Sequence, residues 1–163
     1  MSRAPDHWLF RLSADEWLQA AAADLASGRA QVSSRRAAIT YARRASGMAL
    51  NGLLVAFARA TGDTLGATQR WGRSYIDHLR ALAAESDPAA MHLPSSATSA
   101  SAGLLKIPVV AAQGLVQLGA TPHVPAERSL ELASTLIEAA TAAAARFASS
   151  TEANGETPGP PAS

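Results

Sequence analysis

The residues with the most chemical potential lie close together in residues 71–82, which read WGRSYIDHLRAL. Arg73 stands five positions before His78, and Asp77 directly precedes the histidine. Histidine titrates near neutral pH and can serve as an acid or a base, whereas arginine binds anions through paired N–H donors. The spacing therefore predicts one candidate site, with Arg73 as an anion-binding residue and His78 as a proton-transfer residue.

A purely structural interpretation of the same residues stays open. Arg73 and Asp77 are four positions apart, which is the spacing of an ordinary ion pair on a helix surface. A histidine on an apolar helix stripe is commonly a core residue that hydrogen-bonds a neighbour. The sequence alone does not choose between a polar core and an active site.

The position of the helix start decides whether Arg73 can approach His78. If one helix begins near residues 66–68, Arg73 points about 140° away from His78, at 100° per residue. Ser74 and Asp77 form a second possible start, because their S-x-x-D spacing is that of a capping box. A helix beginning there would leave Arg73 outside the regular turns and able to reach His78.

Composition limits the class of protein. The chain has 163 residues, of which 48% are hydrophobic and only 5% aromatic, and much of the apolar content is alanine. This predicts a single domain of closely packed helices. There is no cysteine, and His7, His92 and His123 have no metal-ligand spacing, so we expect neither a metal nor a cofactor.

No segment resembles a membrane span. The N-terminus, MSRAPDHWLF, lacks the apolar run of a signal peptide. The most apolar segment, residues 104–118, contains Lys106 and two glutamines and is too short to cross a bilayer. We expect a soluble cytoplasmic protein with no membrane association.

Charge is unevenly distributed although the net charge is only +1. No acidic residue occurs between Asp24 and Asp63, whereas this interval contains Arg29, Arg35, Arg36, Arg43, Arg44 and Arg59. Such an excess can attract phosphate groups, or it can be the solvated face of a helix.

The helix signals predict an all-α, up-and-down bundle of four to five helices over residues 1–148. Ser13 and Glu16 form a capping box for the first helix, and the Ser33-Ser34 pair can cap the second. Later helices are expected over residues 35–60, from 66–68 or 74 to about 82, over 107–118 and over 126–148. Residues 86–103 are expected to form a flexible loop and residues 149–163 a disordered tail.

Residues 17–82 resemble HEPN domains, small helical bundles found in many prokaryotic toxin–antitoxin and defence systems. The resemblance is carried by Trp17, by Asp24-Leu25, by the small-residue seam YARRASGMALNGLL, and by Arg73 and His78, which match the R-x(4–6)-H motif. Many members also have a Glu-Lys pair in the second helix, where this chain has Gly47 and Met48.

The resemblance implies a metal-independent RNA endonuclease or a nucleotide-binding protein that acts as a homodimer. His78 would then move a proton at the RNA 2′-hydroxyl or leaving oxygen, and Arg73 would hold the scissile phosphate. In the dimer each Arg73 could serve the partner's histidine, while Arg35, Arg36 and Arg43 would guide the RNA backbone. The alternative is a non-catalytic helical module that binds a partner protein, such as one encoded beside it.

Overall fold

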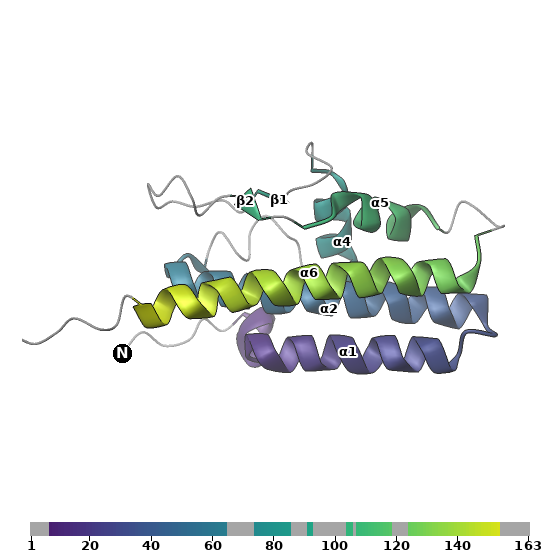
Figure 1. Cartoon of the computed structure of the whole chain (residues 1–163), viewed down its shortest axis with the longest axis horizontal. Coiled ribbons are helices and arrows are strands. Elements are labelled where there is room, and N and C mark those ends of the chain that lie inside the picture. The colour runs from purple at the N-terminus through teal and green to yellow at the C-terminus, as the bar shows by residue number, and fades with distance from the viewer. Residues whose placement is uncertain are drawn as a thin grey trace, which may run out of the picture.

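The computed structural model describes residues 7–64, 74–85, 91–92, 104–105, 107–118 and 124–153. In these ranges the chain is almost wholly helical, which confirms the predicted all-α bundle (Figure 1). The elements are a 3-10 turn η1 (Trp8–Arg11), α1 (Ala14–Ala30), α2 (Arg35–Thr61), α4 (Tyr75–Ala83), β1 (Met91–His92), β2 (Leu104–Leu105), α5 (Val109–Gln117) and α6 (Ala126–Ala153). The two-residue strands β1 and β2 pair antiparallel.

The predicted signals set the starts of the first two helices. The amide of Glu16 donates to the Ser13 hydroxyl, and the Glu16 carboxylate accepts from the Ser13 amide at 2.7 Å, so the capping box is present. Ser34 accepts from the amide of Ala37 and caps α2. Gly62, with φ of +74°, closes the far end of α2 in the left-handed region that favours glycine.

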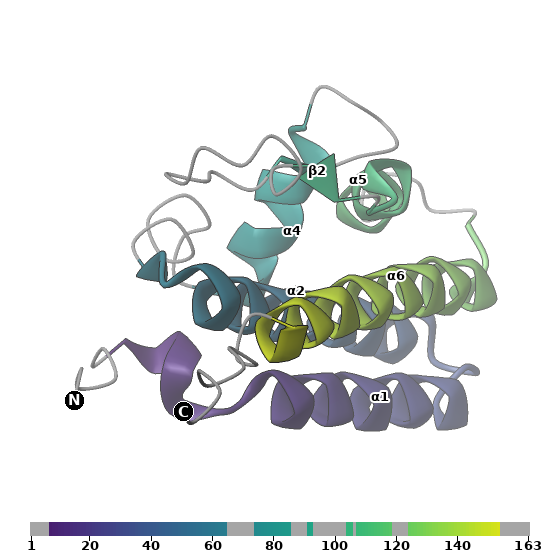
Figure 2. The same cartoon turned by 60° about the vertical axis from the view of Figure 1, so that its left-hand side comes forward.

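The three long helices α1, α2 and α6 pack on one another, with α2 and α6 lying between α1 on one side and a layer of α4 and α5 on the other (Figure 2). α1 and α2 are antiparallel, whereas α6 runs beside α2 in the same direction (Figure 1). At one end Gly28 of α1 lies against both Tyr41 and Leu130, and at the other end the rings of Phe57 and Phe147 meet edge-on. The α4–α5 layer carries the chain back from the end of α2 to the start of α6.

α2 is the central helix of the bundle, as its nearly continuous apolar second half predicts. Leu50, Leu53, Leu54 and Phe57 are each at most 1% exposed. Small residues allow close approach: a Cβ on Gly52 would lie 2.9 Å from the carbonyl oxygen of Ala14. Helices α1, α4 and α6 all pack against α2, so α2 positions the candidate site.

Some predicted boundaries need correction. α6 continues to Ala153, five residues into the predicted tail, and residues 154–163 lie outside the described part. α5 begins at Val109 with Pro108 as its N-cap. Most of the loop predicted at 86–103 also lies outside the described residues, except the short β1 strand. No helix in the described ranges is both long and apolar enough to cross a membrane.

Candidate functional site

α4 begins at the later of the two predicted starts. Ser74 is its N-cap: the Ser74 hydroxyl accepts from the Asp77 amide, and Asp77 Oδ2 accepts from the Ser74 amide at 3.1 Å. This second capping box holds the Oδ2 atom of the Asp77 carboxylate at the start of α4. Arg73 itself lies outside the described residues, so its relation to His78 stays a prediction.

His78 is buried, with only 1% of its surface exposed. Its ring stacks on the indole of Trp8 from η1, with centroids 5.8 Å apart and planes inclined by 25°. Trp8 in turn meets Trp17 of α1 edge-on, and the Trp17 indole N–H donates to the carbonyl of Leu9 at 2.9 Å. The aromatic N-terminal segment thus packs back on the bundle, and it lies over the candidate catalytic histidine.

Two of the three arginines predicted to bind phosphate donate hydrogen bonds at and after the C-terminal end of α5. Arg43 donates through Nε to the carbonyl of Leu115 at 2.7 Å and through Nη2 to that of Val116 at 3.1 Å. Arg35 donates to the carbonyls of Leu118 at 3.1 Å and Val124 at 2.9 Å. The last carbonyls of a helix have no partner within the helix and carry partial negative charge, so both guanidinium groups stabilise this end.

The cationic surface predicted for RNA is therefore divided. Burial and the nearby charge of Arg80 both lower the pKa of Arg43 below its ordinary value. Arg36 is exposed, one residue beyond Arg35 at the start of α2. Of the three predicted phosphate ligands, Arg36 is exposed in the described structure, whereas Arg35 and Arg43 are half-buried.

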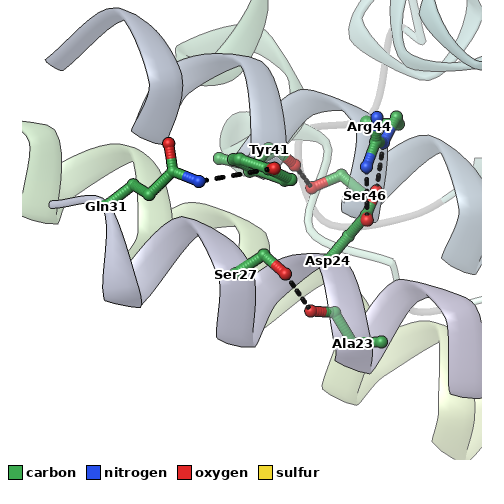
Figure 3. Close-up of polar contacts among 8 residues, drawn as sticks. Ala23, Asp24, Ser27, Gln31, Tyr41, Arg44 and Ser46 are labelled. Atoms are coloured by element: carbon green, nitrogen blue, oxygen red, sulfur yellow. Dashed lines mark hydrogen bonds and ion pairs between the residues drawn. The ribbon is translucent and has the colours of Figure 1, made fainter. Parts of the chain in front are cut away.

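A fourth arginine makes an ion pair that the sequence did not indicate. Arg44 of α2 binds the carboxylate of Asp24 in α1 through both Nε and Nη2, the latter at 2.6 Å from Oδ1 (Figure 3). The hydrogen bond to Asp24 raises the pKa of Arg44. The Arg44 guanidinium carbon also lies 5.1 Å from the ring centre of Tyr41. The two residues are twenty positions apart on different helices, so no local pattern could have paired them.

Gly47 of α2 lies where α4 crosses α2, and its surroundings leave no room for a side chain. A Cβ at this position would lie 2.7 Å from the carbonyl oxygen of Tyr75, where α4 crosses α2. Any side chain here would push the two helices apart. The crossing that places His78 in the core therefore needs glycine at this point of α2.

Open surface lies elsewhere on the bundle. Grooves of about 480, 370 and 240 Å³ run along α6 against α1, α2 and α5, and His78 lines none of the three. The largest carries Glu127, Glu131 and Glu138 over an apolar floor of Val32 and Leu130. Among the described residues, no three or more His, Asp or Glu side chains gather as a metal site would require.

Comparisons of this chain with protein-family models, with curated proteins and with solved structures find no match.

Proposed function

We propose that this chain is a non-catalytic helical module that binds a partner protein. The observation that carries the proposal is the position of His78, which is 1% exposed and stacked on Trp8. A general acid or base must come within hydrogen-bond distance of the proton that it transfers. In the described arrangement the His78 ring is too buried for a substrate to reach it.

The arginines support the same function. RNA binding by charge requires basic groups that reach the phosphates from an open surface. The guanidinium groups of Arg35 and Arg43 donate hydrogen bonds to carbonyl groups at the end of α5, and Arg44 is paired with Asp24. Their roles are those of cross-links between helices. A bundle built in this way presents its open grooves along α6, where a partner chain can pack.

A second candidate is the metal-independent ribonuclease or nucleotide-binding homodimer of HEPN type, with Arg73 and His78 at its centre. One observation favours it: α4 starts directly after Ser74. The continuous helix that would turn Arg73 about 140° away from His78 is thus interrupted at the N-cap Ser74. If the chain is such a ribonuclease in a toxin–antitoxin or defence system, the protein that binds it would be its cognate regulator.

One assay separates the two candidates. Purified protein is incubated with RNA in the absence of metal, beside His78→Ala and, as a control histidine, His123→Ala. The module predicts equal background cleavage in all three, and a stable complex when the chain is co-expressed with the protein encoded beside it. Cleavage that disappears in His78→Ala and survives in His123→Ala would establish the ribonuclease instead. Light scattering then gives the mass, because a shared site requires a dimer.

A further inference from the structure

We propose that η1 is a displaceable cover that controls access to His78. This inference concerns access alone, so it can hold or fail separately from either function above. Its starting point is that one short N-terminal turn supplies the aromatic ring lying against the histidine. A displaceable cover needs a ring that shields His78, an anchor that keeps the segment beside the bundle, and a free-energy cost of the closed position that favours opening.

The ring is Trp8. Its indole is nearly parallel to the His78 imidazole, at a centroid distance of 5.8 Å and an angle of 25°. This geometry occupies one face of the imidazole, and the histidine is left only 1% exposed. Removing the indole would open that face without altering α4, which has its own capping box at Ser74.

The anchor is the next residue, Leu9, and it is independent of the covering ring. Its side chain is buried at 1% exposure, and its carbonyl accepts the indole N–H of Trp17 at 2.9 Å. Trp17 belongs to α1, which begins three residues after η1 ends. The turn can therefore release Trp8 while Leu9 and Trp17 hold the segment beside the bundle.

Release of Trp8 is favoured by a difference in hydrogen bonding between two neighbouring indoles, those of Trp8 and Trp17. Trp17 has its N–H satisfied, whereas the buried N–H of Trp8 has no hydrogen-bond partner among the described residues. Burying a donor without an acceptor costs free energy, and this cost is recovered when the donor returns to water. The closed position of Trp8 is thus held by ring packing against a polar penalty, which lowers the free-energy cost of releasing this side chain.

The stability of η1 as an element is also low. It has four residues in 3-10 geometry, and its N-cap is the ring of His7, whose Nδ1 accepts from the Leu9 amide at 3.3 Å. Short 3-10 turns have poorer hydrogen-bond geometry than α-helices, and segments of this kind open at low free energy compared with the core. α1 and α2 would stay folded while η1 opens.

The test measures His78 directly with diethyl pyrocarbonate, which acylates accessible neutral imidazoles, and locates the product by peptide mass mapping. Folded full-length protein and three variants are compared: Trp8→Ala, Trp8→Phe and Phe10→Ala. We expect His78 in Trp8→Ala to react at least tenfold faster than in the unmodified sequence. Phe10→Ala removes a ring from the same turn that is not the one stacked on His78, and should change the rate less than twofold. Trp8→Phe keeps a ring and deletes the unsatisfied N–H, so His78 should react as slowly as in the unmodified chain or more slowly.

Two outcomes would overturn the cover. One is an unchanged His78 rate in a Trp8→Ala protein whose circular dichroism shows a folded bundle. The other needs no variant: the His78 rate is followed in low urea, below the global transition. A displaceable cover predicts reaction with a weak urea dependence, whereas the full urea dependence of global unfolding would show that η1 opens only with the whole bundle.

Discussion

Gly47 of α2 and Tyr75 of α4 pack so closely that a methyl group on the glycine would lie 2.7 Å from the tyrosine carbonyl oxygen. This contact fixes where the second helical layer crosses the first. Because the backbones of the two helices are in direct contact here, the first turn of α4 cannot shift along α2 without a clash. The contact can be tested by adding the missing methyl group.

Gly47→Ala should lower the free energy of unfolding by about 1–3 kcal/mol, because the added methyl group meets backbone atoms that cannot move aside. Gly114→Ala is a matched control within a helix. Its new methyl group would meet only the tip of Leu132, at 2.8 Å from Cδ1. That flexible side chain can yield, and alanine gains up to about 1 kcal/mol of helix propensity over glycine. Urea denaturation measures both; equal losses would show that the Tyr75 contact is not special.

Arg43→Met should cost about 1.5–3 kcal/mol, since it removes two charge-assisted hydrogen bonds to α5 carbonyls and keeps much of the apolar stem. Arg36→Met, on the exposed side of the same helix, should stay within about 0.5 kcal/mol of the starting protein. Hydrogen exchange at α5 should rise in the first variant only. A similar loss for both arginines would argue against a specific cap.

The pair Asp24–Arg44 should be worth more than an exposed ion pair. Its side chains are 13% and 39% exposed, whereas those of Glu131 and Arg128 are 65% and 58% exposed. A double-mutant cycle with Asp24→Asn and Arg44→Met should give a coupling of about 1 kcal/mol. The Arg128–Glu131 cycle should give about 0.3 kcal/mol, as for helix-surface pairs. The ranking of the two couplings, measured by urea denaturation, is the decisive result.

Glu16 should contribute stability that disappears in acid. Its hydrogen bonds from the amide and side chain of Ser13 lower its pKa below the ordinary value of 4.5. The unfolded chain therefore binds the proton more readily, so this contribution is complete above pH 4.5 and is lost as the pH falls through the lower folded pKa. Glu16→Gln should flatten the stability curve in that window, because glutamine cannot ionise. Asp15→Asn, next to it but outside the cap, tests whether any acidic residue in this turn has the same effect.

Local patterns predicted the caps of the helices well, because a cap is formed by residues three positions apart. Ser13 with Glu16, and Ser74 with Asp77, lie where the sequence placed them. The extent of α2 was also predictable, since it ends at Thr61 before a glycine that adopts positive φ. The end of α6 was misjudged because alanine and serine near residues 149–153 give little signal for or against a helix.

Relations between distant segments could not be predicted. Nothing in the sequence around Arg43 indicates that its donors meet carbonyls more than seventy residues later, at Leu115 and Val116. The burial of His78 was one of two interpretations that its apolar stripe allowed, but the ring that covers it comes from the N-terminal segment, 70 positions earlier. The part played by Arg73 remains a prediction.

The parallel course of α2 and α6 has a consequence for folding order. The hydrogen bond from Arg35 to the Val124 carbonyl joins residues 89 positions apart, whereas α1 and α2 meet through a short turn. Contacts between near neighbours close small loops and form early, while distant ones must wait for the entropy of a large loop to be overcome. We expect the α1–α2 hairpin to form while the chain is still emerging from the ribosome. The apolar face of α2 that packs against α6 would then stay exposed to solvent until α6 has been synthesised.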